Sequence, residues 1–208
     1  MLRLHHAPLA CSLASRLALV ESGLEHEIAF IDTAKGEQKS AAYLALNPRG
    51  QAPALETDHG VLTESTAILP YIADLAPTRQ LLPSAGTFAR GQAQSWLSFL
   101  SSTLHVGLAR AMFPPPGCDN PEAQAAALAK VTLAYQDVDA HLAGRDHLLD
   151  VFSVCDLYLL VFGLWRAYPA LAGKLPPLTN LDQAQQKLLA RPGLGAILVE
   201  EMQLRAKA

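Results

Sequence analysis

Residues 47–72 read NPRGQAPALETDHGVLTESTAILPYI and give the clearest indication of the fold in this sequence. Pro53 lies at the start of a predicted strand, and Glu64 and Ser65 open a predicted helix over residues 65–75. The first feature offers backbone hydrogen bonds to a peptide ligand. The second offers free N–H groups and the positive end of a helix dipole, which suit an anion. The stretch therefore predicts a ligand site as well as local structure.

Outward from this stretch, the first 76 residues predict the element order βαβαββα. Asp58-His59-Gly60 predicts a turn that joins two strands into a hairpin. Asn47-Pro48 ends the preceding helix, because a residue before proline avoids the helical region. This order predicts a small mixed sheet covered by helices. The predicted strands are 2–5, 25–32, 54–56 and 61–63, and the predicted helices are 11–22, 41–46 and 65–75.

The pattern changes after residue 76. Residues 77–86 are rich in proline and small residues and predict a linker. Residues 87–208 carry apolar side chains at helical spacing, which predicts an all-helical domain. The chain is thus expected to form an α/β domain over 1–76, the linker, and a helical domain over 87–208. The predicted helices of the last domain are 88–112, 121–143, 153–168, 181–189 and 194–204.

Bulk composition excludes several classes of protein. The chain has 208 residues, of which 50% are hydrophobic, and a net charge of −3. The apolar fraction is ample for a core, and the mild acidity argues against nucleic acid or an anionic membrane as partner. No apolar run approaches the roughly 20 residues of a membrane span. Three cysteines far apart, Cys11, Cys118 and Cys155, are typical of free thiols in a reducing cytoplasm.

Five further-reaching segments of the chain are ACSLASRLAL (10–19), NPRGQAPAL (47–55), LTESTAILPYIADLAP (62–77), WLSFLSSTLH (96–105) and SVCDLYLL (153–160). Together they resemble the cytosolic glutathione transferases, and the resemblance covers essentially the whole chain. A cysteine just before the first helix is most similar to the bacterial beta class. The resemblance implies a thioredoxin-like N-terminal domain, a helical C-terminal domain, glutathione as cosubstrate, a small hydrophobic electrophile as second substrate, and a homodimer.

The resemblance assigns roles to four residues of the opening stretch. In the family the proline at Pro53 follows a cis bond, and the residue before it pairs its N–H and C=O with the cysteinyl part of glutathione. That residue is Ala52 here. Ser65 is implied to bind the γ-glutamyl carboxylate, and Glu64 to attract the α-amino group. Taken alone, this pair also fits an ordinary helix cap.

A second group of polar residues flanks these positions. Lys35, Gln38, Arg49 and Gln51 fit a solvated surface, but a cation would complement the glycine carboxylate of glutathione. Lys35 and Gln51 match positions that the beta class uses. The resemblance therefore implies these two as contacts to glutathione.

Cys11 and Ser12 are the candidates for the chemistry at sulfur. The reaction needs the thiolate of glutathione, and a hydrogen-bond donor aimed at that sulfur stabilises the anion. Cys11 lies at a predicted helix N-terminus, where its own pKa should be lowered, and it ranks ahead of Ser12. Other classes of the family use a serine here, and a lone cysteine is also often a small buried hydrophobe. No tyrosine stands in the first strand or its loop, which excludes a tyrosine-type mechanism.

The helical domain supplies two further candidates. His105 follows Trp96 at the spacing at which the beta class places a histidine facing the glutathione sulfur. Ser102 is expected to keep one polar contact with glutathione. Ser98 and Val106 stand where asparagine and lysine are familiar in the family, so fewer contacts are expected from this domain.

Other features favour structure over chemistry. Ser153 and Asp156 have the spacing of a capping box before an apolar helix. His5 and His6 adjoin on a strand and point to opposite faces, so no metal site is expected. Five residues are candidates for an acceptor pocket, although core packing is expected for at least half of them: Leu9, Leu13, Phe113, Trp165 and Tyr168.

These observations predict an enzyme that activates the glutathione thiolate and conjugates it to hydrophobic electrophiles. Two alternatives stay open. One is a non-catalytic binding or regulatory protein of the same fold, because fold does not fix function. The other is glutathione-dependent thiol–disulfide exchange at Cys11.

Overall fold

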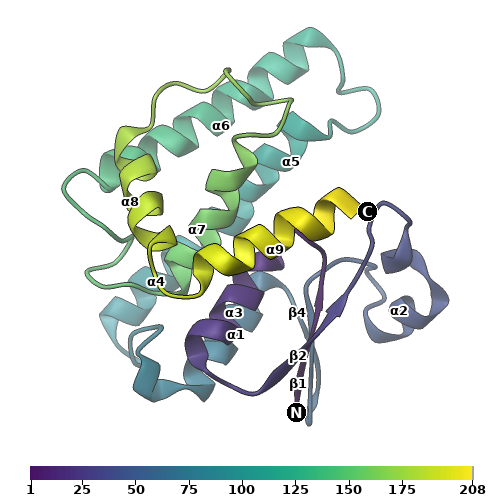
Figure 1. Cartoon of the computed structure of the whole chain (residues 1–208). Helices are drawn as coiled ribbons and strands as arrows, with labels where there is room; N and C mark the ends of the chain where they lie inside the picture. Colours follow the sequence, from purple (N-terminus) through teal and green to yellow (C-terminus); the bar gives the residue numbers. More distant parts are fainter. Residues whose placement is uncertain (208) are drawn as a thin grey trace.

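The computed structural model describes residues 1–207 of the chain. A small sheet with flanking helices forms one part, and a group of helices packs above it (Figure 1). The last helix crosses back from the helical part over the sheet part. Across the described residues, no helix is both long and apolar enough to cross a membrane.

The N-terminal part has the predicted order βαβαββα. Strand β1 pairs in parallel with β2 and antiparallel with β3, and β3 pairs antiparallel with β4, which gives the sheet order β2-β1-β3-β4. The predicted strand 25–32 and helix 11–22 are both shorter in the structure. The elements are β1 (Leu2–His6), α1 (Leu13–Ser22), β2 (His26–Phe30), η1 (Glu37–Lys39), α2 (Ala41–Leu46), β3 (Ala54–Thr57), β4 (Gly60–Thr63) and α3 (Ser65–Leu75).

The strand register brings four chain segments to one edge of the sheet. His6 at the end of β1 is paired with Phe30 at the end of β2. Ala54 at the start of β3 is paired with His5 on one side and with Thr63 at the end of β4 on the other. The segments that follow β1, β2 and β4 therefore meet the segment that precedes β3 at this edge, hereafter called the strand edge.

The C-terminal part is helical, as predicted, but its first long helix is not uniform. The predicted helix 88–112 contains a π-helical segment, η3, between two α-helices. A π turn changes which residues share a face, and such turns are frequent at functional sites. The elements are η2 (Pro77–Arg79), α4 (Phe88–Phe99), η3 (Leu100–His105), α5 (Val106–Met112), α6 (Pro121–His141), α7 (Val154–Trp165), α8 (Thr179–Leu189) and α9 (Leu194–Lys207).

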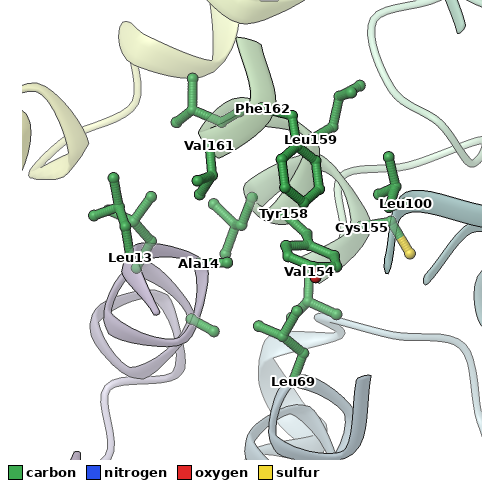
Figure 2. Packing of buried hydrophobic residues seen from close by; sticks show 14 of the residues in the cluster. Leu13, Ala14, Leu69, Leu100, Val154, Cys155, Tyr158, Leu159, Val161 and Phe162 are labelled. Atoms are coloured by element: carbon green, nitrogen blue, oxygen red, sulfur yellow. The ribbon is translucent and has the colours of Figure 1, made fainter. Parts of the chain in front are cut away.

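Helix α7 forms the centre of the core. Its capping box is confirmed, because the Asp156 carboxylate accepts from the Ser153 backbone N–H at 2.8 Å while the Ser153 side chain caps the helix. Figure 2 shows side chains of α7 meeting Leu13 of α1, Leu69 of α3 and Leu100 of η3. The core is therefore shared by both parts of the chain, and the boundaries 76 and 87 stay a prediction.

Candidate functional site

The strand edge opens into a cavity of about 740 Å³. The sheet part lines one side through the segments after β1 and β2, the segment before β3 and the start of α3. Residues of η3, α5, α7 and α9 line the other side. Segments that are far apart in sequence thus share one cavity between the two parts of the molecule.

Ala52 and Pro53 lie in this cavity, and the peptide bond between them is cis, as the resemblance implies. Gln51 lines the cavity as well. Its carbonyl oxygen accepts from the Tyr43 hydroxyl at 2.8 Å and from the Asn47 amide nitrogen at 2.7 Å. These two bonds fix the backbone that leads into β3, so the loop presents its peptide groups in a defined geometry.

The start of α3 faces the same cavity through Glu64, Ser65 and Thr66. Glu64 has a φ of 72°, which is rare for a residue with a side chain. Within residues 1–207, its side chain makes no capping hydrogen bond to the helix. The first N–H groups of an α-helix have no partner inside the helix, so those of α3 remain available to an anion.

Cys11 lies just before α1, and its sulfur donates to the Ala52 carbonyl oxygen at 3.4 Å. The predicted lowering of its pKa is wrong. Burial raises the pKa of the Cys11 thiol to about 11, and the backbone N–H groups of Cys11 and Ser12 offset this only in part. The nearby Glu64 carboxylate raises it further. At neutral pH Cys11 is therefore a protonated thiol and a hydrogen-bond donor.

Ser12 does not reach the cavity. Its side chain is fully buried, and its hydroxyl pairs with the His6 ring at 2.8 Å and with the N–H and C=O groups of Ala7 at 3.1 and 3.2 Å. The expectation that this hydroxyl competes with Cys11 for the glutathione sulfur is therefore wrong. Sequence cannot show that a helix-capping position faces inward.

A buried carboxylate joins the first strand to the last helix. Glu201 of α9 is fully buried and accepts from the His6 ring at 2.7 Å, from the Leu9 N–H at 2.7 Å and from the Arg16 guanidinium. The Leu9 carbonyl accepts from the Trp165 indole N–H at 2.8 Å. Both polar backbone groups of Leu9 are thus held, and Leu9 keeps a φ of 57° at the cavity wall.

His105 of η3 lines the cavity, with its ring 5.3 Å from that of Phe162 and 5.2 Å from that of Trp165. Burial lowers the pKa of His105, so the ring is neutral at physiological pH. Ser102 points elsewhere, and its hydroxyl donates to the Ser98 carbonyl at 2.7 Å. Because the π segment shifts the register, Ser101 lines the cavity instead, and the expected Ser102 contact is wrong.

Lys35 is also displaced from the cavity. Its ammonium pairs with Asp32 at 2.7 Å on the surface, and its side chain is 69% exposed. Gln38 lines the cavity in its place, together with Thr33. The Gln38 side-chain oxygen is buried and, in the part of the chain that the structure describes, has no hydrogen-bond partner. A ligand N–H can supply that partner.

Sequence reasoning missed Tyr158, a residue of α7 that reaches the cavity from the core side. Figure 2 shows it beside Phe162 and Val154. Burial raises the pKa of Tyr158, the nearby Cys11 and Glu64 raise it further, and a hydrogen bond with Ser65 offsets part of the rise. The phenol therefore stays protonated beside the Cys11 thiol. Its place on a helix predicted to be central gave no sign of this role.

The side of the cavity next to α5 and α7 is apolar and aromatic. Four of the five residues named as pocket candidates line it, and only Leu13 is fully buried in the core. Leu9 and Trp165 line the cavity and also pack against the core that contains Leu13, so the expectation that at least half of the five contribute to core packing is confirmed. The rings of Phe113 and Tyr168 lie edge to face at 5.7 Å. Among the described residues, no group of three potential metal ligands is found.

Comparison with known proteins decides the family. The family described as "Glutathione S-transferase, N-terminal domain" matches residues 2–74. Over 195 residues the chain is 34% identical to glutathione S-transferase GstA of Escherichia coli O157:H7, with 92% of this chain and 94% of the relative covered. The chain belongs to the glutathione S-transferase family.

Other relatives of this glutathione S-transferase agree. Glutathione S-transferase GST-4.5 of Xanthomonas campestris is 35% identical over 212 residues, with 96% of this chain and 98% of the relative covered. A sphingomonad glutathione S-transferase complexed with glutathione has 39% identity and a TM-score of 0.85, covering 96% and 98% of the two chains. The bacterial beta class enzyme of Sphingomonas chungbukensis has 36% identity, a TM-score of 0.84 and the same coverage.

Proposed function

We propose that this transferase binds reduced glutathione along the strand edge and conjugates its thiolate to small hydrophobic electrophiles. The observation that carries the proposal is one cavity that contains Ala52, Ser65 and Cys11 together. These three residues offer partners to three different parts of the same tripeptide. Relatives named glutathione S-transferase along nearly the whole chain support this reading.

The γ-glutamyl end of glutathione has a carboxylate and an ammonium on one carbon atom. The hydroxyl of Ser65 and the free N–H groups at the start of α3 suit the carboxylate. The Glu64 carboxylate, held at the same helix start, suits the ammonium. The peptide groups of Ala52 are placed to pair with the cysteinyl backbone, in the manner of an added strand.

The thiol of glutathione then lies near the Cys11 sulfur, which is 3.4 Å from the Ala52 carbonyl oxygen. Because Cys11 stays protonated, it can turn its S–H from that carbonyl to the glutathione thiolate. The neutral His105 ring and the protonated Tyr158 phenol are further donors on the same cavity. Donors aimed at the developing anion lower the pKa of bound glutathione without any charge from the protein.

The acceptor takes the apolar side of the cavity. Leu9, Phe113, Trp165 and Tyr168 offer aromatic and aliphatic surface next to the place proposed for the thiolate. Aromatic rings stack on a flat substrate and exclude water around it. The chemistry that fits is attack of the thiolate on an electrophilic carbon held against these rings.

The proposal is tested by glutathione-dependent turnover of chlorodinitrobenzene in two variants of Cys11. Cys11→Ala removes the donor and is expected to raise the pKa of bound glutathione by about one unit, which lowers kcat/KM about tenfold at neutral pH. Cys11→Ser keeps an O–H donor and is expected to stay near the wild-type pH profile. Equal profiles for wild type and Cys11→Ala would remove Cys11 from the mechanism.

Thiol–disulfide exchange at Cys11 and a purely regulatory role are less well supported. Exchange needs the thiolate of Cys11, but burial keeps this thiol protonated at neutral pH. A regulatory protein has no need for the aromatic acceptor side of the cavity. Saturable glutathione binding without turnover of any electrophile in the assay above would favour the regulatory role.

We also propose that the transferase is a homodimer. A second groove, of about 320 Å³, runs between η3 and α6, and Phe99, Val106 and Leu133 contribute apolar surface to it. Leu133 is 62% exposed, and contact with a second copy of the chain would bury this apolar side chain. Sedimentation velocity is expected to show a dimer that Leu133→Glu converts to monomer. A monomer in the wild type would contradict this assignment.

We place the protein in the cytoplasm because Cys11, Cys118 and Cys155 are free thiols. Free thiols persist in a reducing compartment, and glutathione in its reduced form is abundant there. Fractionation of the producing cells with an antibody to the protein tests this. Recovery in an oxidising compartment would contradict it.

A further inference from the structure

Glutathione carries a second carboxylate on its glycine end, and among the described side chains one cation lines the cavity. Among the described residues that line the cavity, the charged side chains are Glu64 and Arg205. Glu64 lies at the γ-glutamyl end and repels a carboxylate. Lys35, the cation implied by the resemblance, lies outside the cavity and is paired with Asp32.

The strand edge sets the direction of the bound tripeptide. In the order β4, β3, β1 and β2, the edge runs from Ser65 past Ala52 and Ala7 to Thr33. Four strands about 4.8 Å apart span about 14 Å, which is comparable to an extended tripeptide with a carboxylate at each end. With the γ-glutamyl end at Ser65 and the cysteinyl part at Ala52, the glycine end reaches the segment after β2.

Helix α9 brings Arg205 to this same end. Glu201 anchors α9 over the end of β1 through its bonds to His6 at 2.7 Å and to Leu9 at 2.7 Å. Arg205 follows one helical turn later on the same face. Figure 1 shows the C-terminal end of α9 beside the segment that leads from β2 to α2, and Thr33 of that segment lines the cavity together with Arg205.

The Arg205 guanidinium is available for a ligand. Its side chain is exposed, and in the part of the chain that the structure describes no carboxylate forms an ion pair with it. An arginine fork matches a carboxylate with two parallel hydrogen bonds. Gln38, whose buried side-chain oxygen has no partner among the described residues, lies on the same cavity and can accept the glycine N–H.

We propose that Arg205 of the C-terminal helix binds the glycine carboxylate of glutathione, in place of the lysine at position 35. The inference rests on the proposed function, because it takes glutathione as the ligand. Helix α9 then contributes to the glutathione site and not only to the packing of the two parts. The anchor at Glu201 positions this contact, because it fixes the turn of α9 from which Arg205 projects.

The test combines protein variants with a glutathione that lacks the charge. The dissociation constant is measured by calorimetry for wild type, Arg205→Ala, Arg205→Lys and Lys35→Ala, each with glutathione and with its ethyl ester at the glycine carboxylate. Arg205→Ala is expected to weaken glutathione binding about three- to tenfold, because the pair is partly exposed to solvent. Arg205→Lys is expected to lose less, and Lys35→Ala to stay within about twofold.

The ester arm decides the contact. Wild type is expected to lose about as much affinity on esterification as Arg205→Ala loses with glutathione, and Arg205→Ala is expected to lose little more with the ester. Equal losses on esterification in both proteins would overturn the inference, since the carboxylate would then bind elsewhere. Unchanged glutathione affinity in Arg205→Ala, together with a raised KM for a carboxylated acceptor, would also overturn the inference. If wild type binds no glutathione, both the inference and the proposed function fail. If wild type binds glutathione but Arg205→Ala binds it equally well, only the inference fails.

Discussion

Replacing Glu201 by glutamine is expected to lower the free energy of unfolding by about 3–5 kcal/mol. The carboxylate is fully buried and holds His6, Leu9 and Arg16 at once. The variant removes the buried charge that pairs with the Arg16 guanidinium, itself only 6% exposed, and leaves it the half-exposed carboxylate of Glu200. Thermal unfolding measures the effect, as a drop in Tm of about 6–20 °C for a chain of this length.

Glu200 supplies the matched control. It is the neighbour of Glu201 on α9 and also pairs with Arg16, but its side chain is 51% exposed. Glu200→Gln is therefore expected to change the Tm by at most a few degrees, because exposed ion pairs contribute about 0–1 kcal/mol. Similar losses in the two variants would show that burial of the Glu201 carboxylate is not what matters.

The same residue predicts a pH dependence of stability. Burial by itself would raise the pKa of Glu201, but the hydrogen bonds and charge of His6, with those of Leu9 and Arg16, lower it below 4.5. Because its pKa is lower in the folded state, the ionised Glu201 carboxylate stabilises the native state above pH 4.5. This stabilisation is lost as the pH falls through the folded-state pKa. The difference in unfolding free energy between wild type and Glu201→Gln is therefore expected to narrow in acid.

The second large effect is expected at Ser65. Ser65→Ala removes a hydroxyl that is proposed to bind the γ-glutamyl carboxylate in a nearly buried position, where Ser65 is 6% exposed. A hydrogen bond to a charged group contributes about 1.5–3 kcal/mol, which corresponds to about a 10- to 100-fold rise in the KM for glutathione. Steady-state kinetics at fixed electrophile measures it.

Ser102→Ala is the control for Ser65, because Ser102 bonds to the Ser98 carbonyl and lies off the catalytic cavity. Its KM for glutathione is expected to match that of wild type. Thermal unfolding of both variants checks that the fold is kept. A Ser65→Ala enzyme with wild-type KM would place the γ-glutamyl end away from α3.

Much of the fold was predictable because local signals agreed with one another. Turn residues before β4, the proline before β3 and the capping box of Ser153 each mark a boundary by backbone chemistry alone. The π segment η3 was not predictable, since nothing in LSSTLH distinguishes it from an ordinary helical turn. That one irregularity explains why Ser101 and not Ser102 lines the cavity.

The site residues were predictable where the ends of strands and helices place them. They were less predictable where a side chain has more than one possible hydrogen-bond or ion-pair partner. Ala52, Glu64 and Ser65 line the cavity because strand and helix ends place them there. Ser12 turned to the buried His6 ring, and Lys35 turned to Asp32 on the surface. The His6 ring that Ser12 contacts is itself held by Glu201, which is distant in sequence. Asp32 competes with a ligand for the Lys35 ammonium. Neither pairing can be seen in the sequence.

The pKa of Cys11 shows the limit of reasoning from one feature. Position before a helix predicts a lowered value, but the burial that comes with packing against Ala52 and α7 outweighs it. Only the assembled cavity shows which effect is larger. The raised pKa favours Cys11 as a hydrogen-bond donor to the glutathione sulfur over thiol–disulfide exchange, which needs its thiolate.

A calorimetric titration of the reduced protein with glutathione shows whether the cavity at the strand edge binds the tripeptide. Saturable binding of one glutathione per chain is expected, with a dissociation constant below millimolar. Absence of binding at millimolar glutathione would contradict the proposed site, and with it the roles of Ser65, Ala52 and Arg205.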